Sequence, residues 1–126
     1  FRMVEYRAAF ASSDGKNVDL HFGKCDRFTI AGIDEAGNWR VLEERPTFAL
    51  CEAGDSDESM DAAVKALADC GFVVASRIGR WPYAALYAKG IESVEFRGTI
   101  EEAVRKLFQG SALKPAQGPR ALENPD

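Results

Sequence analysis

A continuous apolar run, Phe72-Val73-Val74-Ala75-Ser76, lies in the middle of the chain. Runs of this length and composition are typical of a strand that is buried on both faces of a parallel sheet. The segment before it predicts a helix over about residues 57–70, because apolar residues recur there at helical spacing at Met60, Ala63, Val64 and Leu67. A helix that leads into a buried parallel strand favours an α/β fold.

Further strands and helices are expected on both sides of this unit. A second helix is expected over residues 82–89, and a third between the capping box Thr99-Ile100-Glu101-Glu102 and Gly110. The order βββαβαβα predicts a mixed five-stranded sheet with flanking helices, which is the connectivity of a ribonuclease-H-like fold. The four other strands are expected at residues 7–11, 28–33, 39–44 and 93–96.

Length and composition are those of a small globular domain. The chain has 126 residues, of which 46% are hydrophobic and 29% charged, so we expect one domain over residues 1–110. Residues 111–126 carry three prolines and few apolar residues and are expected to form a flexible C-terminal tail. The net charge of −4 argues against nucleic-acid binding. With no signal-peptide pattern and no apolar run near the roughly 20 residues of a membrane span, we expect a cytoplasmic protein without a membrane partner.

The three cysteines form no recognisable metal motif. Cys25, Cys51 and Cys70 are odd in number and irregularly spaced, and no CxxC pair occurs. A disulfide framework or a self-contained zinc or ferredoxin-type site is therefore not expected. Free thiols in a reducing cytosol are the simpler interpretation.

The expected topology brings four loops to one edge of the sheet. The loop after the first strand, the start of the second, the end of the third and the end of the fourth all lie at the carboxyl ends of the parallel strands, where open α/β sheets usually bind ligands. Cys70 ends a helix that runs the other way and should lie at the opposite edge. Six side chains on the converging loops could hold an anionic or metal ligand through imidazole, thiolate or positive charge: His21, Lys24, Cys25, Cys51, Arg77 and Arg80.

Each of these residues also has an ordinary structural interpretation. His21 could be a hydrogen-bonded surface residue, Cys25 a small buried hydrophobe and Cys51 part of the loop packing. The basic residues could form a solvated face. The residues alone therefore indicate an anionic or metal ligand without deciding between binding and packing.

Two blocks of the sequence resemble a known family. The first is Ser12-Ser13-Asp14-Gly15-Lys16-x-Val18-x-x-His21-Phe22-Gly23-x-Cys25-x-x-Phe28. The second combines Leu67-Ala68-Asp69-Cys70-Gly71 with Arg77-Ile78-Gly79 and Leu86-x-x-x-Gly90-Ile91. Together they resemble the dinitrogenase iron–molybdenum cofactor biosynthesis family, whose members are of the NifX, NafY and NifB C-terminal-domain type.

The resemblance implies a ribonuclease-H-like fold and a non-enzymatic role for the domain of residues 1–110. Members of the family bind the iron–molybdenum cofactor or its iron–sulfur precursor as cargo. The implied partners are nitrogenase cofactor-assembly proteins and apo-dinitrogenase. The motif histidine, here His21, is implied as the cofactor and metal ligand. A carrier must also release its cargo, which favours an open site with few ligands over a closed cage of four thiolates.

Two other functions stay open from the sequence. A redox or regulatory module would use Cys25 or Cys51 as a responsive thiol. A nuclease, suggested by the fold alone, would need clustered carboxylates on the first strand to hold two metal ions. The centre of that strand, Ala8-Ala9-Phe10-Ala11, carries none, and Asp14 lies in the loop beyond it.

Overall fold

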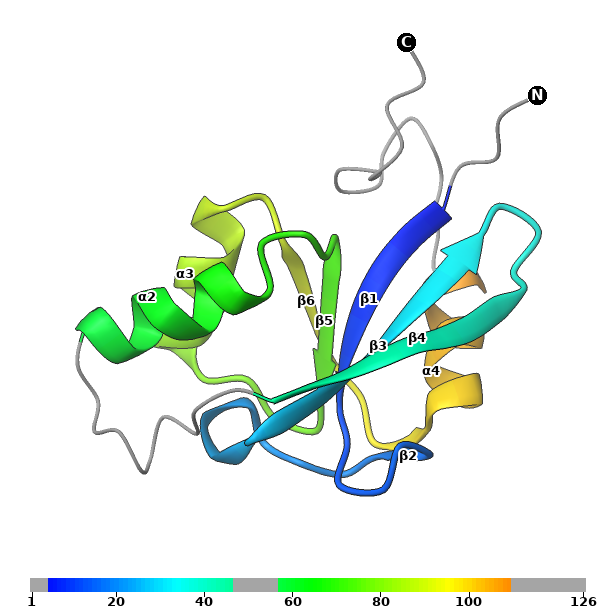
Figure 1. Cartoon of the computed structure of the whole chain (residues 1–126), viewed down its shortest axis with the longest axis horizontal. Helices are drawn as coiled ribbons and strands as arrows, with labels where there is room; N and C mark the ends of the chain where they lie inside the picture. The colour runs from blue at the N-terminus through cyan, green and yellow to red at the C-terminus, as the bar shows by residue number, and fades with distance from the viewer. Residues whose placement is uncertain (1–4, 47–56, 110–126) are drawn as a thin grey trace, which may run out of the picture.

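A mixed five-stranded sheet forms the centre of the protein (Figure 1). The computed structural model describes residues 5–46 and 57–109. The strands lie in the order β4-β3-β1-β5-β6. As the sequence predicts, β1, β5 and β6 are parallel, and β3 is antiparallel to both β1 and β4. Their bounds are β1 (Glu5–Ala11), β3 (Arg27–Asp34), β4 (Trp39–Pro46), β5 (Phe72–Ala75) and β6 (Glu92–Glu95).

Helices cover both faces of this sheet (Figure 1). α2 (Asp57–Ala66) and α3 (Arg80–Ala88) lie on one face, and α4 (Ile100–Gln109) lies on the other. Because side chains alternate along a strand, each central strand contributes to two separate cores. Ala9 and Val73 belong to the cluster under α2 and α3, whereas Phe10 and Val74 belong to the cluster under α4.

The first helix is shorter than predicted. α2 ends at Ala66 rather than near residue 70. The N–H groups of Leu67, Ala68 and Cys70 donate to carbonyls three residues back, so the chain leaves the helix through tight turns. Gly71 then donates its N–H to the carbonyl oxygen of Arg7 at 2.8 Å, which starts the pairing of β5 with β1.

The segment predicted as one long loop after β1 contains local structure. β2 (Asn17–Val18) pairs with β7 (Gly98–Thr99), and η1 (Phe22–Lys24) is a single turn of 3₁₀ helix. The N–H of Ile100 donates to the carbonyl oxygen of Lys16 at 2.8 Å, which ties this segment to the start of α4. Two-residue strands carry no periodicity, so the sequence pattern could not predict them.

Two predicted helix ends are confirmed. At the start of α4, the Thr99 N–H donates to Glu102 Oε1 at 2.9 Å and the Glu102 N–H donates to Thr99 Oγ1 at 3.0 Å, which is a capping box. At the end of α3, Gly90 has a φ of 79° and the N–H of Ile91 donates to the carbonyl oxygen of Leu86, as in a Schellman motif.

Some expectations fall outside the described residues. They are the helix cap expected before α2, the loop that carries Cys51, and the tail expected over residues 111–126. Within the described ranges, no helix is long and apolar enough to cross a membrane.

Candidate functional site

The converging ends predicted for the sheet meet at one edge, which we call the carboxyl edge. Ala11, at the end of β1, pairs with Phe28 near the start of β3, and Arg27 pairs with Pro46 at the end of β4. Ala75, at the end of β5, lies at this edge as well, because β5 runs parallel to β1. The fourth expected loop, over residues 47–56, lies outside the described residues.

His21 is held at the carboxyl edge by main-chain pairing. It forms an isolated parallel bridge with Arg77. The Ser76 N–H donates to the carbonyl oxygen of Leu20 at 3.0 Å, and the Phe22 N–H donates to that of Arg77 at 2.9 Å. These two hydrogen bonds continue the pairing of β5 beyond its last residue. They fix the backbone of His21, whose side chain is half-buried.

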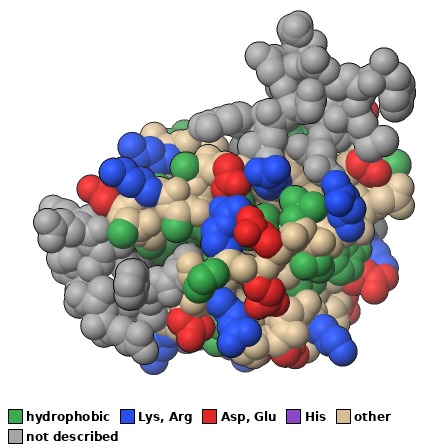
Figure 2. Space-filling view, viewed as in Figure 1, with side chains coloured by type: hydrophobic (Ala, Val, Ile, Leu, Met, Phe, Trp, Pro, Cys, Tyr) green, Lys and Arg blue, Asp and Glu red, His purple; other side chains and the backbone are tan. Residues whose placement is uncertain are grey.

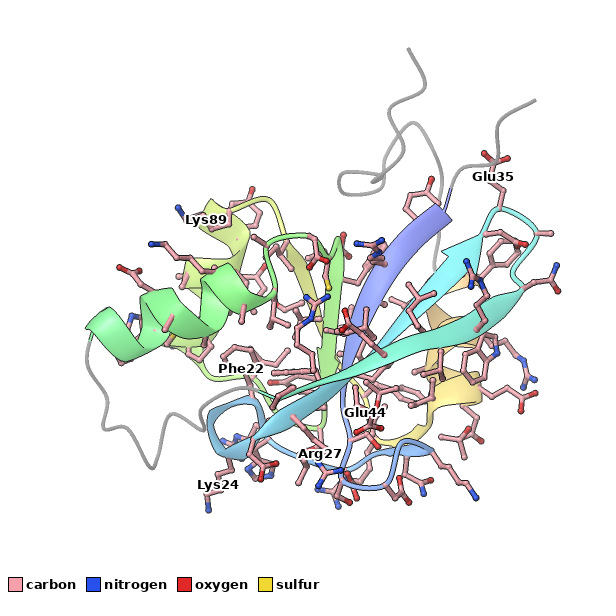
Figure 3. The ribbon with its side chains drawn as sticks, in the orientation of Figure 1. Phe22, Lys24, Arg27, Glu35, Glu44 and Lys89 are labelled. Carbon is pink, nitrogen blue, oxygen red and sulfur yellow. The ribbon has the colours of Figure 1, made fainter. Side chains whose placement is uncertain are left out.

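The turn that follows His21 combines a buried anchor with an exposed cation. Phe22 is 3% exposed and packs against Phe28, with ring centroids 5.8 Å apart. The Lys24 N–H donates to the carbonyl oxygen of His21 at 3.0 Å, which closes η1. Lys24 itself points away from the body of the protein, whereas Phe22 points inward (Figure 3). The anchor therefore fixes both His21 and Lys24 at the surface.

The two cysteines within the described ranges are both buried. Cys25 is 1% exposed and its thiol donates to the carbonyl oxygen of Arg27. Burial raises the pKa of Cys25 to about 12, so the thiolate needed by a metal is disfavoured. Cys70 lies before β5, at the opposite edge as predicted, and burial raises its pKa to about 12 as well. These observations favour packing roles for both, and Cys25 as a ligand stays a prediction.

The polar residues that open the first sequence block shape a loop. Asp14 accepts hydrogen bonds from the N–H groups of Lys16 and Asn17 at 2.8 and 2.9 Å, from the Asn17 side chain, and from Ser12 Oγ at 3.2 Å. The backbone hydrogen bonds hold the pKa of Asp14 well below its usual range. Its carboxylate is thus engaged within the loop, which argues against Asp14 as a ligand in a nuclease-type metal site.

The loop after β5 carries the other predicted cations. Arg77 and Arg80 are exposed, and Ile78 between them is 8% exposed. The Ile78 N–H donates to Glu95 Oε2 at 2.8 Å, and Gly79 is the N-cap of α3 and provides no side-chain hydrogen bond. An open pocket of about 370 Å³ lies on the β6 side of this loop and is lined by Ile78, Gly79, Arg80, Tyr83, Ser93 and Glu95.

Charges at the carboxyl edge are not all available to a ligand. Arg27 pairs with Glu44, whose carboxylate also accepts a hydrogen bond from Thr29 Oγ1 at 3.3 Å (Figure 3). Basic and acidic side chains are interspersed over the face shown in Figure 2. In the ranges that the structure covers, no three His, Cys, Asp or Glu side chains gather closely enough to hold a metal ion.

Sequence reasoning did not identify Ser93 and Glu95 as neighbours of the loop after β5. Both lie on β6, and parallel pairing with β5 brings them beside Ile78. Ser93 Oγ is buried and forms no hydrogen bond with any residue that the structure describes. The alternation of Ser93 and Glu95 with Val94 is a signal for a half-exposed strand, but it gives no indication of what the polar residues meet.

The chain matches one family model and several curated proteins. Residues 4–110 match the model described as dinitrogenase iron-molybdenum cofactor. The FeMo cofactor biosynthesis protein NifB of Chlorobaculum tepidum is 31% identical over 84% of this chain, and that of Klebsiella pneumoniae is 39% identical over 67%. Protein NifX of Klebsiella pneumoniae is 31% identical over 69% of this chain and 54% of its own length. The chain covers only 24% and 19% of the two NifB proteins.

Solved structures with low sequence identity share the fold. The apo form of the orange protein from Desulfovibrio gigas has a TM-score of 0.55 at 21% identity, covering 90% of this chain and 95% of that protein. The protein PH0822 has a TM-score of 0.63 at 19% identity, covering 91% and 95%. At these identities the likeness describes the arrangement of the backbone alone.

Proposed function

This chain belongs to the dinitrogenase iron-molybdenum cofactor family, and from that membership we propose that it binds the iron–molybdenum cofactor, or an iron–sulfur precursor, as cargo during cofactor biosynthesis. The proposed role is carriage without catalysis. The proposed cofactor-binding domain is residues 1–110, followed by the tail of residues 111–126. The sheet order supports assigning the fold to the ribonuclease-H-like type.

The observation that carries this proposal is the position of His21. Its backbone is fixed beside Arg77 at the edge where parallel strands end, and its side chain is half-buried rather than packed in a core. Imidazole is a suitable ligand for iron, and a single fixed imidazole can bind a cluster at one metal without enclosing it. We assign the metal-ligand role to His21.

Positive charge around His21 supports an anionic cargo. Lys24 precedes β3, and Arg77 and Arg80 follow β5, so three exposed cations lie on the two segments that the His21–Arg77 bridge joins. Cations at a partly exposed site attract an anionic cluster and lose that attraction as salt is added. A site of one imidazole and a few mobile cations would hold the cargo and still release it. Cys51 stays a proposed additional ligand.

The proposed partners follow from cargo transfer. A carrier needs a donor and an acceptor, which would be nitrogenase cofactor-assembly proteins and apo-dinitrogenase in a cytoplasmic pathway. The alternative function as a redox module has less support, because Cys25 and Cys70 are buried thiols with raised pKa values. A nuclease function has less support, because the Asp14 carboxylate accepts hydrogen bonds from the backbone of its own loop.

Anaerobic binding with a matched variant tests the proposal. The protein is mixed with the isolated precursor cluster and, separately, with the finished cofactor, and co-elution of iron and visible absorption are measured. The parent and the control Lys65→Ala, an exposed lysine on α2, should bind, and His21→Ala should lose most of the bound iron. Because His21 is the only histidine of the chain, ¹⁵N-histidine labelling would assign any imidazole coupling in the spectrum of the bound cluster to it.

Three results are distinguishable. Binding by the parent that His21→Ala abolishes supports both the role and the ligand. Binding that survives in His21→Ala keeps the carrier but moves the ligand elsewhere. Absence of binding by the parent overturns the carrier proposal.

A further inference from the structure

α3 has an apolar surface on a side that no described element covers. Arg80 is the only charged residue of this nine-residue helix, and only Leu86 is buried. A helix that is hydrophobic all round is normally buried in a core, because a surface helix keeps charged residues on its outer face. α4 follows that rule, with Glu101, Glu102 and Arg105 exposed. The outer face of α3 therefore departs from the pattern of a solvated surface helix.

Two tyrosine side chains lie together on this outer face. Tyr83 is 53% exposed and Tyr87 is 72% exposed, whereas Trp81, which is 40% exposed, is two residues from Tyr83 and projects from a different side of the helix. The rings of Tyr83 and Tyr87 stack, with centroids 6.3 Å apart and planes 12° apart. Stacking holds the two rings together before any partner arrives, which lowers the ordering cost of binding. We call the surface of Tyr83 and Tyr87 the aromatic face.

The aromatic face continues to the loop after β5. Tyr83 also lines the pocket beside that loop, together with Arg80 and Ser93. Arg80 begins α3, and Arg77 lies three residues before it, so the end of the face nearest to the carboxyl edge carries positive charge. Glu95, the acid in the pocket, is engaged by the Ile78 N–H.

We propose that the aromatic face docks a partner protein whose surface is apolar at its centre and carries acidic side chains opposite Arg77 and Arg80. Tyrosine, tryptophan and arginine are the residue types that dominate protein–protein interfaces. The inference rests on the proposed function, since the partner would be a protein that gives or receives the cofactor. Docking on α3 places that partner beside the loop that positions His21.

The positive charge beside the aromatic face favours an acidic partner protein over a second copy of the chain. α3 itself carries no acid, so a second copy seated helix to helix on this face would bring like charge toward Arg80. Like charges across an interface suppress association, whereas an acidic partner gains attraction. Binding to the partner should accordingly weaken as salt is added.

The test uses the double variant Tyr83→Ser/Tyr87→Ser, the single variant Tyr87→Ser, and Val41→Ser as the control. Val41 lies on β4 and is 49% exposed, so it removes exposed apolar surface away from α3. Each protein is loaded anaerobically with cluster, and its iron content is measured first. Affinity is then measured for two purified probes, NifB and apo-dinitrogenase, at low and high salt.

The expected result is equal iron loading in all variants, with affinity for at least one probe lowered about tenfold or more in the double variant and about threefold or more in Tyr87→Ser, as for residues at the centre of an interface. Val41→Ser should bind the probe like the parent. Equal affinity of the double variant and the parent, or no binding of either probe by a loaded parent, would overturn the proposal.

Two further measurements identify other occupants. A parent that dimerises in sedimentation, with a monomeric double variant, would assign the face to a second copy instead. Co-sedimentation of the parent with vesicles of anionic phospholipid, lost in the double variant, would assign it to a lipid surface. Failure of iron loading in the parent would count against the proposed function. This outcome is distinguishable from a loss of partner affinity, because iron content is measured before affinity.

Discussion

His21 and Arg77 are joined by main-chain pairing although the whole β3–β4 hairpin and α2 lie between them in the sequence. The hydrogen bonds on either side of the bridge come from backbone atoms of Leu20, Phe22, Ser76 and Arg77. Changing the two side chains should therefore leave the backbone of the carboxyl edge in place. Ligand binding and folding can be separated at this site.

The cations beside His21 should contribute to cargo affinity. In Arg77→Gln/Arg80→Gln we expect affinity for the anionic cluster to fall about five- to thirtyfold, because each of the two exposed charges contributes roughly 0.5–1 kcal/mol. The dependence of affinity on salt should also flatten, because fewer charges attract the cluster. Anaerobic titration at two salt concentrations measures both effects. Arg105→Gln, an exposed cation on α4, is the control, and equal losses in both variants would argue against a specific role for the loop after β5.

Cys25 should affect stability more than cargo binding. Cys25→Ala removes a buried thiol and its hydrogen bond to Arg27, so we expect a loss of about 1 kcal/mol in the free energy of unfolding, as is common for small core changes. Iron loading should stay within about twofold of the parent, because a thiol with a pKa near 12 is a poor metal ligand. If Cys25→Ala loads as little iron as His21→Ala, the result would instead indicate that Cys25 is a ligand.

The sheet could be predicted because its signals are local and repeated. The apolar run at Phe72–Ala75 and the helical spacing around it predict a buried parallel strand and its flanking helices. The pairing of the five strands confirms which of them are parallel and which are antiparallel. The end of α2 could not be predicted, since it depends on tight turns and on ion pairs of Asp69 with strands far away in the sequence.

The site was predicted at the level of which loops meet, and less well at the level of side chains. Topology alone places His21, Lys24 and the loop after β5 at one edge. The burial of Cys25 depends on how the turn after His21 packs. A sequence pattern does not predict whether a residue in a loop is buried or exposed. The exposure of α3 likewise depends on tertiary packing, although its lack of charged residues was visible in the sequence.

The thiols of Cys25 and Cys70 should react slowly in the folded protein. In a Cys51→Ser background, labelling of the native protein at pH 8 should be about 100-fold slower than in urea, because burial disfavours the thiolate of both residues and unfolding restores it. The rate is measured with a chromogenic disulfide reagent. Labelling of either thiol at the unfolded rate would restore the redox-module alternative, and the urea reaction of the same variant is the control.

An ionic cluster is centred on Asp69, in the turn before β5. Arg45 binds Asp69 in a bidentate arrangement, Nη1 to Oδ1 at 2.7 Å and Nη2 to Oδ2 at 3.1 Å. Arg7 donates to Oδ2 of the same carboxylate at 3.0 Å. The cluster thus connects β1 and β4 to the turn before β5, and hydrogen bonds from Arg45 lower the pKa of Asp69 from 3.8 to about 2.

That depressed pKa gives Asp69 a stabilising role that depends on pH. A carboxylate with a lower pKa in the folded state stabilises the fold above its unfolded pKa of 3.8, and this contribution is lost as pH falls through about 2. Because the side chain is 38% exposed, we expect the linked contribution to be about 1 kcal/mol rather than the full value of the shift. Asp69→Asn should therefore be less stable than the parent at neutral pH, and the difference in the free energy of unfolding should shrink between about pH 4 and pH 2. Urea unfolding across this range, with Asp61→Asn as an exposed α2 control, measures it; a difference that stays constant with pH would mean that Asp69 acts through packing and not through its charge.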